Sequence, residues 1–344
     1  MFEAILAWYN GLTDTLWGSL ALFAVGLVLL IKGGDWFVDS ATAIAKKFRV
    51  PEIIIGATVV SIGTTLPEVM VSATAAMNQN GAIAYGNAIG SIICNTSLIA
   101  ALTIAIRPAP VNRKAITMPV FFFFLSAAIY LVAAYIFGSF ERWLGIVMLC
   151  VFAVYMILTI RQGFKNPVEA EDHAEEGDKE ENNSLVMEII ILIASAAMIA
   201  IGADMLEGSS VSLATMAGIP TEVVGVTIVA LCTSLPELVT AITALAKGHG
   251  ALSLGNIIGA NIFNLVLVSG VAVTLSPFQI PEGSTIFGKN TSLVMELPVM
   301  VSVMALMTLP ALLKKKLFRW QGAVLLCIYA AFVVLQVLIA LHIL

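Results

Sequence analysis

The sequence predicts an all-α, polytopic membrane protein with ten transmembrane helices in two inverted five-helix repeats. Of its 344 residues, 60% are hydrophobic and 11% are charged, whereas about 25% are charged in an ordinary soluble domain. The apolar runs are continuous and reach the roughly 20 residues that a helix needs to span a bilayer; a β-barrel would alternate apolar and polar positions. In addition, the two halves of the chain share a long pattern at one constant offset.

Polar breaks divide the apolar runs into ten expected helices. In chain order the breaks are KKFRVP, NQNG, RPAPVNRK, GSFE, the acidic segment 166–184, AGIP, KGHG, SPFQIPEGSTIFGKN and KKK. The helices between them cover about 14–33 with an extension to 45, 52–77, 83–106, 116–137, 141–161, 185–206, 220–246, 250–275, 291–313 and 318–342. The start, MFEAILAWYNG, lacks the basic residues and the cleavage site of a signal peptide, so we expect the first helix to be retained.

Basic residues predict the orientation of these helices. With the N-terminus outside, the inward-facing connections contain fourteen of them and the outward-facing connections contain two, Arg142 and Lys289. The fourteen are Lys46, Lys47, Arg49, Arg107, Arg113, Lys114, Arg161, Lys165, Lys179, Lys247, Lys314, Lys315, Lys316 and Arg319. Because cytoplasmic connections are rich in lysine and arginine, we expect a multi-pass protein of the cell (inner) membrane with both termini outside.

The two halves match without gaps when 169 is added to the residue number. The matches include Gly33 with Gly202, Asp35 with Asp204, Pro51 with Pro220, Thr64 with Thr233, Glu68 with Glu237, Asn87 with Asn256 and Asn95 with Asn264. We therefore expect a first five-helix repeat at 1–161, an acidic cytoplasmic loop at 162–184 and a second repeat at 185–344. Five spans per half place the second repeat upside down, which is typical of secondary transporters with a central binding site. The loop has too few apolar residues to fold.

Each half contains one glutamate inside an apolar helix, Glu68 in GTTLPE and Glu237 in CTSLPE. A charged residue at this depth costs about 2.5 to 3.5 kcal/mol and usually has a function. The proline before each glutamate cannot donate to the carbonyl group four residues earlier, so that oxygen becomes available as a ligand. Thr64 and Thr233 lie four residues before the glutamates, on the same helical face. No basic residue lies near either glutamate in these spans.

The helix after each glutamate carries amide and hydroxyl groups at intervals of four residues. They are Asn87, Ser91 and Asn95 in GNAIGSIICN, and Asn256 and Asn264 in GNIIGANIFN, where Ala260 corresponds to Ser91. Two carboxylates among neutral oxygens suit a hard cation such as Ca²⁺, and the lack of histidine and thiolate clusters argues against zinc or copper. Asn87 and Asn256 have an alternative role, because asparagines also bind neighbouring membrane helices together.

Other residues are expected to shape the packing of the helices. Gly86, Gly90, Gly255 and Gly259 form small-xxx-small faces that allow a close approach between helices. Asp35 and Asp204 lie near the ends of spans, where we expect them to anchor or cap helices.

The motifs GATVVSIGTTLPEVMVSA with GNAIGSIICN, and GVTIVALCTSLPELVTA with GNIIGANIFN, resemble the calcium/cation antiporter superfamily, prokaryotic sodium/calcium exchanger type. By motif position, the resemblance implies that the metal ligands are Glu68, Glu237, Thr64, Thr233, Thr65, Ser234, Ser91, Asn95 and Asn264. In that family pattern the two glutamates bind calcium and sodium in turn, and the first threonine of each motif contributes its carbonyl. The remaining hydroxyl residues belong to flanking sodium sites. The first and sixth helices would slide to expose the site to either side.

Two departures from the family pattern leave the coupling ion open. Ala260 lacks a hydroxyl that family members commonly have, and Asn95 and Asn264 are both neutral where many members have one aspartate. We expect an antiporter that exchanges Ca²⁺ for Na⁺ by alternating access, with a Ca²⁺/H⁺ antiporter of the same fold as the alternative. We expect no cofactor, no nucleic-acid partner and a monomeric transport unit in the lipid bilayer.

Two other functional classes use similar residues. An intramembrane enzyme would use the carboxyl groups as acid and base. However, the sequence has no nucleophile constellation, and the two acids have similar surroundings, so we expect no enzymatic activity. A channel would use the same ligands without coupling, and calcium flux with and without an opposing cation gradient distinguishes it from an antiporter.

Overall fold

The computed structural model describes residues 11–108, 111–165, 184–218, 230–281, 285–286 and 288–341. Within these residues nine helices are long and apolar enough to cross a membrane, in agreement with the predicted all-α, polytopic fold. The seventh expected span, 220–246, is described only from residue 230, and it contains a shorter apolar helix at Leu235–Ala246. Most of the acidic loop lies outside the described residues. The count of ten helices and the division into two repeats stay predictions.

The helices follow the predicted order, and several continue through π-helical turns, which carry the label η. In the first half they are α2 Leu16–Phe48, α3 Glu52–Ile55, η1 Gly56–Val60, α4 Ser61–Met77, α5 Gly81–Cys94, η2 Asn95–Ala100, α6 Ala101–Ile106, α7 Arg113–Val132, η3 Ala133–Phe137 and α8 Arg142–Lys165. In the second half they are α9 Leu185–Met216, α11 Ala230–Thr233, α12 Leu235–Ala246, α13 Gly250–Phe263, η5 Asn264–Val268, α14 Ser269–Leu275, η6 Ser292–Glu296, α15 Leu297–Lys314 and α16 Arg319–Ala340.

Among the described residues, four short strands lie outside the helices. They are β1 Ser139–Phe140, β2 Phe278–Gln279, β3 Thr285–Ile286 and β4 Lys289–Asn290. Strand β1 pairs with β2, and β3 pairs with β4, both antiparallel. The β1–β2 pair joins the first half of the chain to the second, and the Phe140 and Phe278 rings pack with their centroids 5.3 Å apart.

Helices α2 and α9 begin at corresponding positions of the two halves. Thr15 caps α2 by accepting a hydrogen bond from the Gly18 N–H. Ser184, which is 169 residues further along, caps α9 by accepting one from the Met187 N–H. Hydroxyl side chains are favoured at this position because they satisfy N–H groups that have no partner inside the helix. The two halves therefore start their first long helix by the same local chemistry.

Helix α9 is longer than predicted. We expected its end at residue 206, but it continues to Met216, so that boundary was wrong. Gly208 follows Leu206 by two residues, but the helix continues through it; the helix ends at Ala217 and Gly218, where Gly218 adopts a φ of 76°. A glycine with positive φ just after the last turn is a common helix end.

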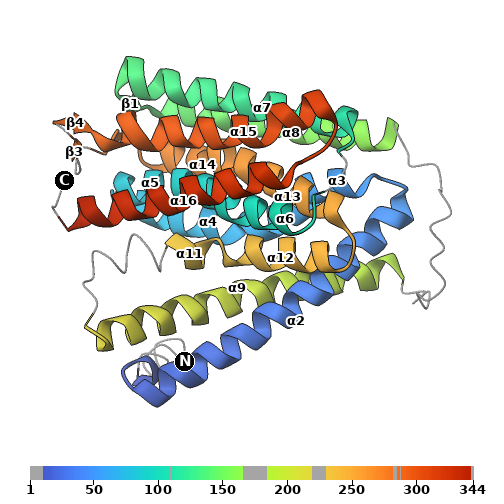
Figure 1. Ribbon diagram of the computed structural model, residues 1–344, viewed down its shortest axis with the longest axis horizontal. Coiled ribbons are helices and arrows are strands. Elements are labelled where there is room, and N and C mark those ends of the chain that lie inside the picture. Colours follow the sequence, from blue (N-terminus) through green and yellow to red (C-terminus); the bar gives the residue numbers. More distant parts are fainter. Residues whose placement is uncertain are drawn as a thin grey trace.

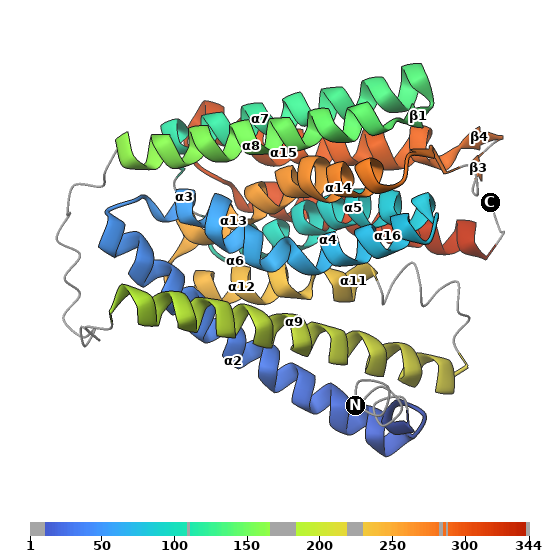
Figure 2. The same cartoon turned by 180° about the vertical axis from the view of Figure 1, so that it is seen from behind.

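Helices α2 and α9 lie side by side along one face of the bundle and run in opposite directions (Figure 1, Figure 2). Helices α7, α8 and α15 lie on the opposite face, with α4, α5, α12 and α13 between the two layers. In the most apolar part of the continuous helix Gly250–Leu275, 83% of the residues are buried, against 11% for α16. The helices that carry the two glutamates and their neighbours are thus surrounded by protein.

Small residues bring α2 and α9 into close contact at two points. A Cβ atom on Gly202 would lie 2.8 Å from the Gly26 carbonyl oxygen, and a Cβ atom on Gly33 would lie 3.1 Å from the Ser195 carbonyl oxygen. The offset of 169 converts the first pair into the second, since Gly26 corresponds to Ser195 and Gly33 to Gly202. The two helices therefore cross with the same contact made twice.

The expected glycine faces differ in what they contact. A Cβ atom on Gly255 would lie 2.2 Å from the Ile53 carbonyl oxygen, and one on Gly259 would lie 2.7 Å from the Ala57 Cα. Helix α13 therefore packs directly against the backbone of α3 and η1. No described atom comes within 4 Å of such a Cβ on Gly86 or Gly90. By the offset of 169, Ile53 and Ala57 correspond to residues 222 and 226, so the equivalent neighbours of Gly86 and Gly90 lie outside the described residues.

The two ends of the bundle differ in charge. The start of α2, the end of α16 and the strands lie at one end, on the left of Figure 1. The opposite end contains the connections 48–52, 106–113, 246–250 and 314–319, the end of α8 and the start of α9. The basic residues that the sequence assigns to the inside belong to these connections or to adjoining helix turns, apart from Lys179, which lies outside the described residues. The basic residues thus gather at one end of the molecule.

Candidate ion-binding site

The two glutamate motifs adopt different local backbones. Helix α4 continues through Pro67 without interruption. In the second half the helix breaks at Ser234, which has φ −95° and ψ 8°, and Pro236 lies in the first turn of the new helix α12. Proline is tolerated there because the N–H groups of a first turn have no helical acceptor. In α4, Pro67 leaves the carbonyl group four residues earlier without its usual N–H donor, whereas in the second half the break at Ser234 has this effect.

Glu68 and Glu237 meet at the centre of the bundle. Both side chains are fully buried, and their carboxyl groups lie close enough to interact electrostatically. None of their four carboxyl oxygens makes a hydrogen bond of normal geometry. Among the described residues, no lysine, arginine or histidine forms an ion pair with either glutamate. Two acids from different halves of the chain thus share one buried position without a basic partner.

Neutral polar side chains with no hydrogen-bond partner lie on α4, just before α12, and on the neighbouring elements α5, η2 and η5. They are Thr65, Ser91, Asn95, Ser234 and Asn264, each at most 2% exposed. A buried polar group left unpaired costs about 1 to 3 kcal/mol, so proteins usually retain such groups for a ligand or bound water. Hydroxyl and amide oxygens are donors that Na⁺ and Ca²⁺ accept. The chemistry of this donor set fits a hard cation.

Contacts across the two halves assemble these residues into one site. The Glu237 carboxyl lies next to the hydroxyl groups of Thr64 and Thr65. The Ser234 hydroxyl lies next to Cys94, the residue before Asn95. The π-turn η2 packs against α12, and η5 packs against α4. Each asparagine-bearing turn therefore contacts the glutamate helix of the opposite half.

Asn95 and Asn264 each begin a π-helical turn, which the sequence did not predict. The turns are η2 and η5, and their first residues differ by the offset of 169. A π-helical turn inserts one extra residue and widens the helix, and such turns are frequent at functional sites. We find no local sequence signal for them other than their equal positions in the two halves.

Asn87 and Asn256 differ from Asn95 and Asn264 because they are hydrogen-bonded. The Asn87 amide donates to the Glu68 carbonyl oxygen at 3.2 Å and to the Ser72 hydroxyl at 2.9 Å. The Asn256 amide oxygen accepts from Ser61 at 3.2 Å and from Thr64 at 3.3 Å, and its NH₂ group donates to Thr240 at 3.1 Å. These asparagines join helices around the site, as the alternative interpretation anticipated.

Ser61, Ser72 and Thr240 are supporting residues that sequence reasoning missed. Ser61 lies three residues before Thr64, and Thr240 lies three residues after Glu237. Residues three and four apart share a helix face, so the spacing could have indicated them. Thr233 is partly buried at the end of α11, next to Ser234. Ala260 is fully buried and presents a methyl group where the first half has the Ser91 hydroxyl.

Asp35 connects α2 to the core of the bundle. The Lys247 ammonium group, just after α12, lies 3.0 Å from the Asp35 carboxylate and 2.8 Å from the Asp39 carboxylate, one turn further along α2. Partial burial lowers the pKa of Lys247, but hydrogen bonds to Asp39 and Asp35 outweigh it and raise the pKa above its ordinary value. Asp35 thus anchors a helix through a side-chain ion pair, but the expected position near a span end was wrong, because Asp35 lies inside α2 and Asp204 lies inside α9.

Comparison with known proteins agrees with this arrangement. The sequence profile of the sodium/calcium exchanger protein family matches residues 18–161 and 187–338. An uncharacterized membrane protein of Methanocaldococcus jannaschii is 34% identical over 320 residues, which cover 90% of this chain and 95% of the relative. The sodium/calcium exchanger MaX1 of Methanosarcina acetivorans is 31% identical over 349 residues, or 92% of this chain and 97% of the relative.

A solved structure extends the likeness to the fold. The sodium-calcium exchanger NCX_Mj aligns with a TM-score of 0.76 at 31% sequence identity, over 91% of this chain and 97% of that one. Sequence and structure therefore agree over almost the whole length of the protein. The chain belongs to the sodium/calcium exchanger protein family.

Proposed function

We propose that this protein exchanges Ca²⁺ for Na⁺ across the membrane by alternating access. The observation that carries the proposal is the pair Glu68 and Glu237, two buried carboxyl groups that face each other among unpaired neutral oxygens. Relatives named as sodium/calcium exchangers support Na⁺ as the coupling ion and do not favour H⁺. The protein performs no chemical step on its substrates; it moves ions.

The charge of the carboxyl pair explains obligatory exchange. Two ionised carboxylates carry a charge of −2, which is costly to hold in a low-dielectric interior without compensation. One Ca²⁺ neutralises the pair, and so do two Na⁺, with a third Na⁺ as a further option. The unloaded site therefore cannot easily be enclosed, whereas either loaded site can. Calcium release on one side then requires sodium to enter before the site returns.

The ligands divide between the two ions by their position. Glu68 and Glu237 bind both ions in turn, and the carbonyl groups of Thr64 and Thr233 complete the calcium site together with them. Thr65, Ser91 and Ser234 provide hydroxyl oxygens for flanking sodium ions. The amide groups of Asn95 and Asn264 face the site from the wide π-turns. All of these donors are neutral apart from the glutamates, so the glutamates alone set the charge that must be balanced.

The surroundings of the site supply the moving parts. Helices α2 and α9 form a separate layer over the core, and we assign to this pair the movement that exposes the site alternately to each side. We assign the basic end of the bundle to the cytoplasmic side, with both termini outside a cell membrane. A single chain contains both glutamates, so one copy suffices for transport.

Calcium flux in proteoliposomes tests the proposal. The purified protein is reconstituted into proteoliposomes, and calcium is added outside them, first with an opposing Na⁺ gradient and then with an opposing pH gradient. We expect the Na⁺ gradient to drive calcium uptake and the pH gradient to have no effect. Uptake driven only by the pH gradient would contradict the assignment of Na⁺. Uptake that needs no opposing gradient would indicate a channel, and the absence of any flux would contradict transport.

A further inference from the structure

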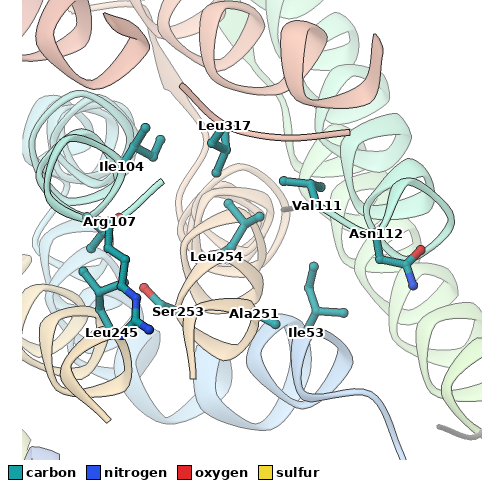
Figure 3. A pocket seen from close by; sticks show the side chains of 12 residues that line it. Ile53, Ile104, Arg107, Val111, Asn112, Leu245, Ala251, Ser253, Leu254 and Leu317 are labelled. Carbon is teal, nitrogen blue, oxygen red and sulfur yellow. The ribbon is translucent and has the colours of Figure 1, made fainter. Parts of the chain in front are cut away.

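A small pocket, partly open to solvent, lies at the basic end of the bundle, away from the two glutamates (Figure 3). It is enclosed by the starts of α3 and α13, the ends of α6 and α12, and the connections after α6 and α15. Most of its lining is aliphatic, and the polar exceptions include Arg107, Asn112 and Ser253.

The two connections that line the pocket are strongly basic. Residues 107–114 and 314–319 contain seven basic residues and no acidic residue. They are Arg107, Arg113, Lys114, Lys314, Lys315, Lys316 and Arg319. The Val111 N–H donates to the Lys315 carbonyl oxygen at 2.8 Å and holds the two connections together. The pocket thus opens among positive charges that come from distant parts of the chain.

The pocket contains one buried hydroxyl group without a hydrogen-bond partner, on Ser253, and one exposed arginine, Arg107. The Ser253 side chain is 3% exposed, lines the pocket and makes no hydrogen bond through its hydroxyl. Figure 3 places Ser253 and the Arg107 guanidinium on the same side of the pocket. Among the described residues, Arg107 forms no ion pair. A buried hydroxyl and an arginine therefore point to an acceptor that the protein itself does not supply.

The N-terminus of α13 adds backbone donors to the same place. Gly250, Ala251 and Ser253 line the pocket, and the first N–H groups of a helix have no intrahelical acceptor. The residue before the helix, His249, does not cap it, because its ring pairs with the Glu52 carboxylate at 2.8 Å. The same pairing holds the carboxylate of Glu52, the residue before Ile53, against His249. The helix end remains available to an anion.

We infer that this pocket binds the phosphate group of an anionic phospholipid at the cytoplasmic face of the membrane. A phosphate accepts hydrogen bonds from an arginine fork, a hydroxyl and a helix N-terminus together. Basic pockets between membrane helices on this side recognise acidic headgroups. The aliphatic lining contributed by Ile104, Leu245 and Leu254 suits the glycerol and first acyl carbons of a lipid better than a fully hydrated free anion.

Binding to the purified full-length chain tests this assignment without any measurement of transport. The protein in detergent is titrated separately with phosphatidylglycerol, phosphatidylcholine and inorganic phosphate, and binding is followed by native mass spectrometry and by thermal stabilisation. We expect saturable binding of phosphatidylglycerol, at least tenfold weaker binding of phosphatidylcholine, and no competition by millimolar inorganic phosphate. Inorganic phosphate that binds while phosphatidylglycerol does not would overturn the lipid assignment.

Variants locate the binding in the pocket. Arg107→Gln should weaken phosphatidylglycerol binding about tenfold or more, because it removes a charge-assisted contact, and Ser253→Ala should weaken it a few-fold. Arg161→Gln is the matched control, an exposed arginine at the same end that does not line the pocket. Equal losses in Arg107→Gln and Arg161→Gln would mean general charge attraction and would overturn the site. So would an unchanged affinity in Arg107→Gln and Ser253→Ala.

Discussion

Glu68 and Glu237 carry the charge of the candidate ion site, and no other acidic residue lies beside them in the described structure. Replacing either by glutamine keeps the shape of the side chain but removes one negative charge. We expect Glu68→Gln and Glu237→Gln each to reduce calcium exchange at least 100-fold, because a site with charge −1 cannot balance Ca²⁺. Transport in proteoliposomes measures this, with size-exclusion profiles to verify folding. Glu141→Gln, at an exposed position, is the control, and full activity in either core variant would contradict the site.

Ser91 and Ala260 allow a test of the sodium sites. A neutral oxygen contact contributes about 1 kcal/mol, or roughly a fivefold change in affinity. We expect Ser91→Ala to weaken the apparent affinity for Na⁺ by about that factor, and Ala260→Ser to strengthen it. The double variant transfers the hydroxyl from one half of the chain to the other. Sodium-dependent calcium uptake measures these affinities, and unchanged values in both single variants would remove Ser91 from the sodium sites.

The residue pattern predicted much of the chemistry at the centre. The spacing of Glu68 and Glu237 within apolar helices indicated two acids in a common layer, and the structure buries both. It did not decide between the roles of Asn256 and Asn264, because both follow the same four-residue period. Their difference depends on which neighbours reach them: Asn256 faces Ser61 and Thr240, while Asn264 faces no hydrogen-bond partner. Such tertiary contacts leave no trace in the period of a single helix.

At the scale of helices, the order was predictable and the irregularities were not. Hydropathy and polar breaks gave the order, since a bilayer requires long apolar helices. The wide turns η2 and η5, and the break at Ser234, depend on packing between the halves. Pro67 and Pro236 occupy equal sequence positions, yet only the second follows a helix break. Two similar motifs, GTTLPE and CTSLPE, therefore adopt different backbones in the two halves.

The contact between Gly26 and Gly202 predicts sensitivity at the crossing of α2 and α9. A Cβ atom on Gly202 would lie 2.8 Å from one backbone oxygen and 2.9 Å from the Leu30 nitrogen, so Gly202→Ala must push the helices apart. We expect overpacking of this kind to lower stability by about 1 to 3 kcal/mol and to slow transport. Thermal unfolding in detergent checks this. The neighbouring Ile201→Ala, on the exposed side of α9, should change stability less; equal effects would argue against the crossing.

The ion pairs of Lys247 predict a salt-sensitive link between α2 and α12. We expect Lys247→Met to reduce the free energy of unfolding by roughly 0.5 to 1 kcal/mol, as for exposed pairs, and the difference to shrink at high salt. The raised pKa of Lys247 means that the pair stabilises fully below its ordinary value of 10.5 and is lost as pH rises through the higher folded value. Unfolding at several salt concentrations measures this, with Lys289→Met as control. An effect that is independent of salt would contradict an electrostatic link.

For the molecule as a whole, the distribution of basic residues predicts its orientation in the membrane. We expect a cysteine at Asn78, in the exposed turn after α4, to react with an impermeant maleimide added to intact cells. A cysteine at Lys46, in the last turn of α2, should react only after permeabilisation. The exposed native residues Cys150 and Cys327 are first replaced by alanine. The reverse pattern would invert the topology and would place the anion pocket on the outer face.

The pairing of β1 with β2 limits how such a molecule can change shape. Strands β1 and β2 come from different halves of the chain. They pair antiparallel, and the rings of Phe140 and Phe278 are in contact. A mechanism in which the two halves moved apart as rigid units would have to break the β1–β2 pairing in every transport cycle. We therefore expect the parts that this pairing joins to stay together during transport, while helices outside it, such as α2 and α9, move. An engineered disulfide between β1 and β2 should accordingly leave the rate of calcium exchange unchanged.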